Sequence, residues 1–256
     1  MNKAEVVVFN PWTLTTLKRI PIGKGPSFSV ELTPDHRFAV AAAAGSNEVV
    51  VIDARTYEIV RHIPVGKFPC DLTLSLDGKL AYEPDRDQDT VSVIDWRSGK
   101  TLRIIPFASG SEPRMLTLSP DGKHLWVEER DSSKVSVYAT QTFERLAHLP
   151  VGKMPATNEF TPLGGYTIVT HMGDNVIKVF ETDTFREIKS VKVGQSPVNA
   201  AVRPDGRYVY VTNRLSGTVS VIETERWTVA KTLKVGEKDF GIYLFDSTEG
   251  TMAGNR

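Results

Sequence analysis

The sequence predicts an all-β protein built from repeated four-stranded antiparallel units. The chain of 256 residues matches itself at a spacing of about 42 residues, as repeat folds do. Within each repeat, apolar and polar residues alternate as they do in strands, and turn signals such as Pro-Asp-Gly separate the alternating runs. Helical spacing is not sustained anywhere in the chain. Four short strands in a repeat of about 40–50 residues indicate the blades of a β-propeller.

Three sequence markers recur in the same order and define the repeats. The glycine turns, such as "PVGKFP", begin at Pro21, Pro64, Pro150, Lys192 and, in a weaker copy, Lys234. The turns of the Pro-Asp-Gly type are "TPDH" at Thr33, "SLDG" at Ser75, "SPDG" at Ser119, "TPLG" at Thr161 and "RPDG" at Arg203. The third marker is "VVVID", "VSVID", "VSVYA", "IKVFE" and "VSVIE". The third repeat carries the longer segment "PFASGSEP" in place of its glycine turn.

The fifth repeat shows how the four strands follow one another. Strand A is "VNAAV" (198–202), and the Pro-Asp-Gly turn leads into strand B, "YVYVT" (208–212). In this turn proline fixes φ and glycine allows a positive φ, which suits a hairpin. Strand C is "VSVIE" (219–223), and strand D is "VAKTLKV" (229–235).

The two ends of the chain together supply one further blade. Residues 239–256 align as strands A and B, and residues 1–25 align as strands C and D. The sequence therefore predicts a single domain over 1–256, a six-bladed β-propeller whose last blade is closed by both termini. Such closure removes an exposed sheet edge.

The amino-acid composition limits the kinds of binding partner and the cellular compartment that we expect for this protein. Lys plus Arg and Asp plus Glu number 31 each, so the chain as a whole has no excess of basic residues of the kind that favours nucleic acid. Cys70 is the single cysteine, which rules out an internal disulfide. No apolar run is long enough to span a membrane, and the first residues do not form a signal peptide. We expect a cytoplasmic monomer, or a periplasmic or secreted one if a leader was removed.

The stretch "PDGRYVYVTNRLSGTVSVIETERWTVAKTLKVG" resembles the YVTN repeat of bacterial and archaeal β-propellers. The resemblance extends over essentially the whole chain, although the fifth repeat alone carries the full "YVTN" string. It implies a propeller. It implies much less about function, because the family includes surface-layer, periplasmic and cofactor-enzyme propellers.

The ends of the B strands carry the first group of candidate site residues. In propellers the D–A and B–C loops lie on one face, around the mouth of the channel. At the position of Asn213 we interpret asparagine as a turn residue that bonds its own backbone. The equivalent position holds Asp85, Glu129 and His171 in repeats two to four, and we name these three as catalytic candidates. The next position holds Arg86, Arg130 and Arg214, and these arginines together with Asn213 are candidates for ligand binding.

The A strands supply the second group. Their candidates for ligand binding are Asp71, Asn158, Glu159 and Asn199, together with Arg114 after the inserted loop. Asn158 stands in a row that is otherwise apolar, and a polar residue there costs stability unless it is hydrogen-bonded. An asparagine that caps neighbouring strand ends is the structural alternative. No sequence motif identifies a cofactor or a metal site, and oxygen ligands of this kind leave a divalent cation as an option.

Two functions follow from these residues. The first is a binding propeller that holds a small molecule or a protein at the mouth of the top face. The alternative is an enzyme of the hydrolase, lyase or cyclase type with acid–base chemistry in the same funnel. We expect a nearby carboxylate to raise the pKa of His171. Solvated loop residues that pair across the rim are the ordinary alternative, and such pairs contribute only about 0–1 kcal/mol each.

Overall fold

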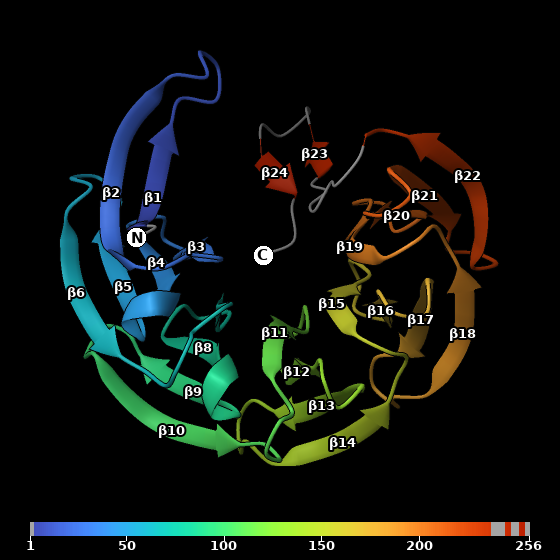
Figure 1. Ribbon diagram of the computed structural model, residues 1–256, viewed down its shortest axis with the longest axis horizontal. Coiled ribbons are helices and arrows are strands. Elements are labelled where there is room, and N and C mark those ends of the chain that lie inside the picture. The colour runs from blue at the N-terminus through green and yellow to red at the C-terminus, as the bar shows by residue number, and fades with distance from the viewer. Residues whose placement is uncertain (1–2, 237–243, 247–250, 254–256) are drawn as a thin grey trace. The chain divides into compact units, whose positions relative to one another are not determined.

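The computed structural model describes residues 3–236, 244–246 and 251–253 of the chain (Figure 1). The chain divides into two compact units, residues 1–116 and 117–256, which we call the N-terminal and C-terminal units. Among the described residues there are five four-stranded sheets and two two-stranded sheets. We number the four-stranded sheets as blades 1 to 5 in chain order.

The N-terminal unit holds a two-stranded sheet and blades 1 and 2. The two-stranded sheet is β1 (Lys3–Phe9) with β2 (Thr16–Lys24). Blade 1 is β3 (Val30–Leu32), β4 (Phe38–Ala43), β5 (Glu48–Asp53) and β6 (Ile59–Pro64). Blade 2 is β7 (Thr73–Leu74), β8 (Leu80–Asp85), β9 (Thr90–Asp95) and β10 (Lys100–Pro106). Two short 3-10 helices, η1 (Ala44–Ser46) and η2 (Arg86–Gln88), form the B–C loops of these blades.

The C-terminal unit holds blades 4 and 5 and most of blade 3, because the boundary between the units falls inside β11. Blade 3 is β11 (Pro113–Leu118), β12 (His124–Glu129), β13 (Lys134–Ala139) and β14 (Arg145–Pro150). Blade 4 is β15 (Pro155–Phe160), β16 (Tyr166–His171), β17 (Val176–Glu181) and β18 (Glu187–Lys192). Blade 5 is β19 (Pro197–Val202), β20 (Tyr208–Asn213), β21 (Thr218–Glu223) and β22 (Thr228–Lys234). The second two-stranded sheet is β23 (Leu244–Asp246) with β24 (Thr251–Ala253).

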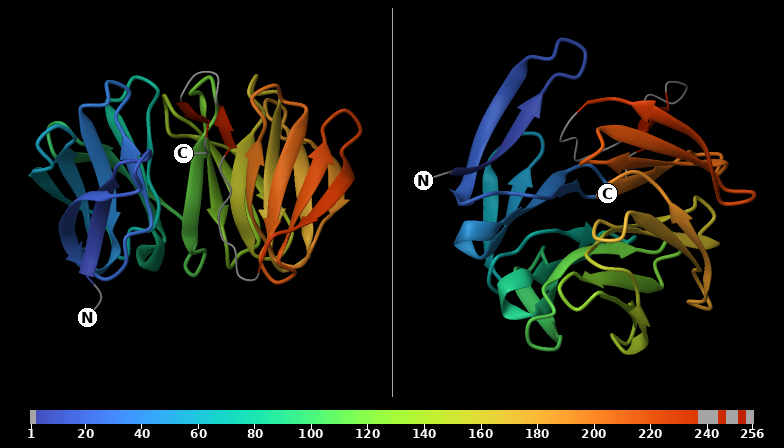
Figure 2. Two further views of the ribbon diagram at one scale, coloured as in Figure 1. Left: turned by 90° about the horizontal axis from the view of Figure 1, so that it is seen from above. Right: turned by 45° about the vertical axis from the view of Figure 1, so that its right-hand side comes forward.

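Every blade has its strands in the order A-B-C-D, with antiparallel neighbours. The A–B turns use a residue at positive φ, such as Gly206 at 72°, and His36 takes this position in blade 1 at 55°. The left view of Figure 2 shows the connecting loops of the C-terminal unit gathered at its two ends. One of these ends carries the D–A and B–C loops of each blade, and we call it the loop end.

Apolar side chains fill the space between consecutive blades. Val49, Val51, Leu72 and Leu74 belong to one buried cluster between blades 1 and 2. Trp126 of blade 3 is fully buried, and its ring lies edge-on to Phe160, Phe180 and Phe185 at 6.0 Å between centroids. In the C-terminal unit the A strands β15 and β19 contact each other, as do the D strands β18 and β22. Burial of these faces is the main favourable contribution to the packing of blade on blade.

The predicted all-β propeller fold is confirmed, and each predicted strand of the repeats is present. The blade count of six agrees with the five complete blades and the two terminal strand pairs. The single domain over 1–256 and the blade shared by residues 1–25 and 239–256 stay predictions, and residues 239–243, 247–250 and 254–256 lie outside the described residues. Within the part of the chain that the structure describes, no helix is long and apolar enough to cross a membrane.

Candidate functional site

The last residue of each B strand is buried, so this position does not lie on a solvated rim. Ala43, Asp85, His171 and Asn213 are at most 1% exposed, and Glu129 is 2% exposed. The interpretation of Asn213 as a turn residue that bonds its own backbone is wrong. Its amide Nδ2 instead donates to the hydroxyls of Thr218 and Ser220 on the neighbouring C strand, at 3.1 and 2.9 Å.

The glycine of the recurring "VG" turn lies directly against this buried position. A Cβ atom on Gly194 would lie 2.7 Å from Cβ of Asn213, and one on Gly152 would lie 3.0 Å from the ring of His171. Gly66 packs in the same way against the carboxyl group of Asp85. The glycine is therefore required because the D–A loop passes too close to the end of strand B for any side chain.

Blade 2 gathers most of the predicted residues of the N-terminal unit. Oδ2 of Asp85 accepts hydrogen bonds from Thr90 at 2.8 Å and from Ser92 at 2.7 Å. Oδ2 of Asp71 accepts one from the backbone N–H of Leu116 at 3.0 Å.

Glu83 also belongs to this cluster, although it was not among the candidate residues predicted from the sequence. Glu83 is fully buried, and its Oε1 accepts a hydrogen bond from the backbone N–H of Cys70 at 3.1 Å. The equivalent residues of the other B strands are apolar: Ala41, Val127, Val169 and Val211. The rule that singled out Asn158 in a row of apolar residues would have found Glu83 as well.

Burial shifts the titration of every acid in this cluster. It raises the pKa of Glu83 well above the ordinary range, and the nearby Asp85 and Asp71 carboxylates add to the effect. Burial also raises the pKa of Asp85, where the hydroxyls of Ser92 and Thr90 oppose it. Burial raises the pKa of Asp71 to about 6, although the backbone of Leu116 favours its charged form.

Arg86 and Arg114 bring positive charge to the same cluster. The guanidinium of Arg86 binds Asp87 at 2.7 Å and stacks 3.7 Å above the ring of Phe68. The backbone carbonyl of Arg114 accepts a hydrogen bond from Sγ of Cys70 at 3.1 Å. Within the described part of the chain, Arg114 forms no salt bridge. The predicted residues Asp71, Asp85, Arg86 and Arg114 thus surround Cys70 and Glu83, and we call these six residues the blade 2 acid cluster.

Glu129 and His171 belong to the C-terminal unit, where each has a different environment. Oε1 of Glu129 accepts a hydrogen bond from Ser136 at 2.6 Å and lies 3.0 Å from Nε2 of His148 on strand D. Ser132 donates to its other oxygen at 3.2 Å. All the contacts of the Glu129 carboxylate that the structure records are with its own blade. A single site shared by Asp85, Glu129 and His171 therefore stays a prediction.

The pKa of His171 is lowered to about 4, so the expectation of a raised pKa is wrong. Burial of the ring is the largest cause, and the charge of Lys178 adds to it, while Asp174 opposes it. Neither ring nitrogen has a hydrogen-bond partner of good geometry in the described part of the chain, although the backbone of Val176 lies close enough to oppose the fall in pKa slightly. The imidazole is fully buried, so the neutral ring is its stable form.

Asn158 and Glu159 contact the neighbouring blades of the same unit. With its amide nitrogen facing blade 3, Asn158 donates to both carboxylate oxygens of Glu128, and its oxygen accepts from Thr117 at 3.3 Å. Burial raises the pKa of Glu159 well above the ordinary range, and a hydrogen bond from the backbone of Val202 opposes this. The structural alternative was that Asn158 caps the ends of neighbouring strands. The observed contacts come close to this, although Asn158 binds the side chain of Glu128 and not a strand end.

The remaining candidates occupy the predicted positions. Arg130 and Arg214 follow the ends of β12 and β20, and both are partly exposed. The backbone carbonyl of Asn199 accepts a hydrogen bond from Thr212 at 3.4 Å. The structure does not test a binding role for these three residues. Among the described residues, no group of three or more His, Cys, Asp and Glu side chains is arranged to hold a metal ion.

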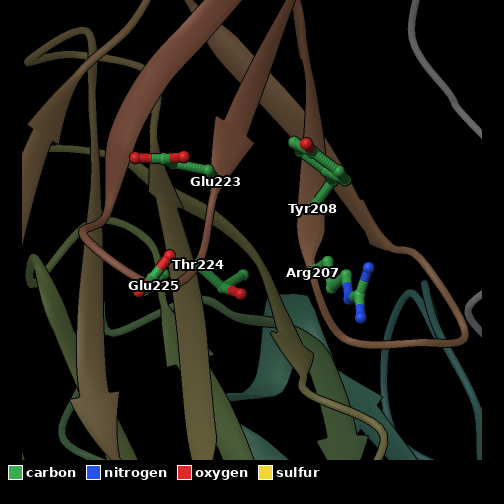
Figure 3. A pocket seen from close by; sticks show the side chains of 5 residues that line it. All are labelled: Arg207, Tyr208, Glu223, Thr224 and Glu225. Carbon is green, nitrogen blue, oxygen red and sulfur yellow. The ribbon is translucent and has the colours of Figure 1, made fainter.

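Two cavities lie away from these residues. A polar pocket of about 440 Å³ is formed by residues from the start of β20 and from the turn after β21 (Figure 3). Its lining residues are Arg207, Tyr208, Glu223, Thr224 and Glu225. An apolar groove of about 360 Å³ lies in the N-terminal unit, between β1 and blade 1. Neither cavity is lined by a residue that was predicted to form the site.

Comparisons with known proteins support the fold. A family model described as "Lactonase, 7-bladed beta-propeller" matches residues 55–149, which is less than half of the chain. No curated protein matches the chain. Three similar solved structures share only 19–20% of their sequence with this chain and show the fold alone. Membership of the YVTN family stays a resemblance.

The first of the three is hydrazine synthase from Kuenenia stuttgartiensis, with a TM-score of 0.80, 20% identity, and coverage of 91% of this chain and 81% of that chain. The second is dihydro-heme d1 dehydrogenase NirN, with a TM-score of 0.78, 19% identity, and coverage of 95% of this chain and 54% of that chain. The third is the periplasmic gluconolactonase PpgL of Pseudomonas aeruginosa, with a TM-score of 0.76 and 20% identity. In that comparison 91% of this chain and 77% of that chain are covered.

Proposed function

We propose that this protein binds a small hydroxylated organic acid at the loop end of blade 2. The observation that carries the proposal is that Asp71, Asp85, Arg86 and Arg114 lie around the neighbouring residues Cys70 and Glu83 in one unit. In propellers this end of each blade faces the mouth of the channel, where a ligand can enter.

The chemistry of the cluster suits such a ligand. A guanidinium binds carboxylate through two parallel hydrogen bonds, and Arg114 has no salt bridge within the described residues that would compete. Asp71 is partly exposed as a residue, although the protein around its carboxyl group is dense enough to raise the pKa, and we expect this carboxylate to accept hydrogen bonds from ligand hydroxyl groups. The lactonase match spans the whole cluster, so an aldonic acid is a reasonable first probe.

Isothermal titration with gluconate tests this function. We expect binding by the wild-type protein and at least a tenfold loss of affinity in Arg114→Ala, because one charge-assisted pair is worth about 1.5–3 kcal/mol. Arg55→Ala is the control, since Arg55 is exposed in a turn of blade 1 outside the cluster. The absence of gluconate binding, or an equal loss in both variants, would contradict the proposal.

Hydrolysis of a lactone is the second candidate. It is favoured by the pKa of Asp71, which at about 6 suits a general base near neutral pH. Water would attack the lactone carbonyl and lose a proton to the Asp71 carboxylate. The C–O bond of the ring would then break, and the proton would pass from Asp71 to the departing ring oxygen.

A pH-stat assay with glucono-δ-lactone tests this candidate against the rate in buffer alone. We expect activity to fall below about pH 6, as Asp71 takes up a proton. Asp71→Asn should bind gluconate and lose turnover. A protein that binds gluconate but leaves the lactone at the buffer rate is a binding protein and not a lactonase.

The candidates of the C-terminal unit remain part of the proposal. They are Glu129, His171, Arg130, Asn158, Glu159, Asn199, Asn213 and Arg214. If they line the same mouth, His171→Ala should weaken gluconate binding while the melting temperature stays near the wild-type value. A loss of stability alone would assign His171 to packing.

We also propose that the protein is a monomer in the cytoplasm. The gluconolactonase among the similar structures is periplasmic, so the compartment needs its own test. Sedimentation of the purified protein measures the oligomeric state, and fractionation of cells measures the location. A divalent cation is a further option, and titration with Ca²⁺ and Mg²⁺ examines it directly.

A further inference from the structure

Two carboxyl groups of β8 each leave one oxygen without a partner. Glu83 and Asp85 are two residues apart on one strand, so their side chains lie on the same face of blade 2. Both side chains are 0% exposed. Among the described residues, neither Oε2 of Glu83 nor Oδ1 of Asp85 has a hydrogen-bond partner.

Buried oxygens of this kind are costly. A buried polar atom without a partner lowers stability, and two adjacent buried negative charges lower it much more. A single proton between the two free oxygens removes both costs.

The other hydrogen bonds favour a proton on Glu83 over one on Asp85. Oδ2 of Asp85 accepts from two hydroxyls, those of Thr90 and Ser92, which is the environment of an ionised carboxylate. Glu83 accepts only one bond, from the backbone of Cys70. Contact with Asp85 raises the pKa of Glu83, and contact with Glu83 lowers that of Asp85.

We propose that Glu83 and Asp85 share one proton, with Oε2–H of Glu83 donating to Oδ1 of Asp85, and that this bond fixes the loop 65–70. The pair holds both ends of that loop. Gly66 packs on the Asp85 carboxyl at one end, and the N–H of Cys70 binds Glu83 at the other. Between them, Phe68 stacks on Arg86, and the loop leads directly to Asp71.

The pair is therefore a positioning device for the acid cluster, which goes beyond the proposed function. Asp71 and Cys70, before β7, face Glu83 of the pair. Arg86 in η2 and Arg114 in β11 act on Cys70, whose N–H binds Glu83. Asp71 favours the proton on Glu83. Ionisation of Glu83 at high pH would place two charges face to face and release the loop.

The sign of the pH dependence follows from the raised pKa of Glu83. Above about pH 4.5 the unfolded chain has lost this proton while the folded chain keeps it. Stability from this group therefore decreases as pH rises, up to the pKa of the folded state. The unfolding equilibrium constant should rise about tenfold per pH unit from this one proton.

Infrared difference spectroscopy tests the shared proton without any ligand, so its failure is distinct from a failure of gluconate binding. At pH 7 the wild-type protein should show the carbonyl band of a protonated carboxylic acid, and Glu83→Gln should lose one such band. Glu58→Gln is the matched control, because Glu58 is exposed on blade 1. An unchanged acid band in Glu83→Gln would overturn the proposal.

Hydrogen exchange of the Cys70 amide tests the hold on the loop. In the wild type the protection factor of this amide should fall at least tenfold over the pH range in which the carbonyl band of the protonated acid disappears. In Glu83→Gln the amide side chain can donate to Asp85 and accept from Cys70 at every pH, so protection should stay constant. If that variant does not fold, the wild-type measurement alone decides, since pH-independent protection would contradict the proposal.

Discussion

Single glycines determine which side chains can end the B strands. Gly152 has no positive φ, so its role is space and not backbone freedom. A Cβ at this residue would lie 3.0 Å from the His171 ring and 2.6 Å from Oδ2 of Asp174. The "VG" marker of the sequence is thus a steric requirement of the next blade.

Gly152→Ala should lower the free energy of unfolding by about 1–3 kcal/mol, because the added methyl group overpacks a rigid contact. Gly165→Ala is the matched control, since a Cβ at Gly165 would meet nothing within 4 Å. Urea denaturation measures both variants. Equal stability of the two variants would show that the loop moves aside without cost.

His171 should make stability depend on pH on the acid side of neutrality. Its pKa is about 4 in the folded protein and about 6.5 in the unfolded chain, so the unfolded chain takes up a proton first. Stability should fall as pH decreases from 6.5 to 4, by about 2–3 kcal/mol in all. Denaturation of wild type and His171→Gln over this range measures the effect, and a wild-type curve no steeper than that of the variant would contradict it.

At the scale of the strand, carboxylates bind the open edges of the A strands. Glu31 of β3 accepts from the backbone N–H of Leu74 in β7 at 2.9 Å, and Asp71 accepts from Leu116 in β11. Glu159 receives the corresponding bond from Val202. These acids satisfy N–H groups that no strand of their own sheet can reach.

Glu31→Ala should lower the free energy of unfolding by about 1–3 kcal/mol, because it leaves the N–H of Leu74 without an acceptor in a buried position. Glu31→Gln keeps an acceptor oxygen and should recover most of the loss. Thermal denaturation of the two variants provides the comparison. A Gln variant as unstable as the Ala variant would mean that charge, and not the acceptor, is what matters.

The strands were predictable from sequence because their signals are local. Alternation and Pro-Asp-Gly turns fixed each strand without knowledge of its neighbours. Contacts between side chains could not be predicted from the sequence, because they depend on which residues face each other across a strand pair. Asn158 was found as an anomaly, but its partner Glu128 was not, and Glu83 escaped notice. The fall in the pKa of His171 depends on burial of the ring, whereas the expectation from the sequence considered only a nearby carboxylate.

At the scale of the whole molecule, the two terminal strand pairs should complete one blade. β1 and β2 have the character of strands C and D, and β1 buries Ala4 in a cluster with Ile20, Ile22 and part of blade 1. Val7 and Phe9 are 39% and 54% exposed, so apolar surface remains for further strands. The groove between β1 and blade 1 is apolar as well.

Deletion of residues 1–10 should lower the melting temperature sharply, because it removes β1 from this cluster. Deletion of residues 244–256 should have a similar effect if those residues pair with β1. Since both deletions would then disrupt one blade, their combined effect should be smaller than the sum. Additive losses measured by calorimetry would contradict a shared blade.

The buried end of strand B has a consequence for protein engineering. Where it holds Asp85, Glu129 or Asn213, a serine follows seven residues later on strand C, whereas Ala43 is followed by Val50 and His171 by Lys178. One backbone geometry thus accepts an acid, an amide, an imidazole or a methyl group, provided that this one partner changes with it. The repeat therefore tolerates different side chains at the end of strand B without a change in its backbone. A combinatorial library that varies these two positions together, one blade at a time, would sample new chemistries without redesigning the scaffold.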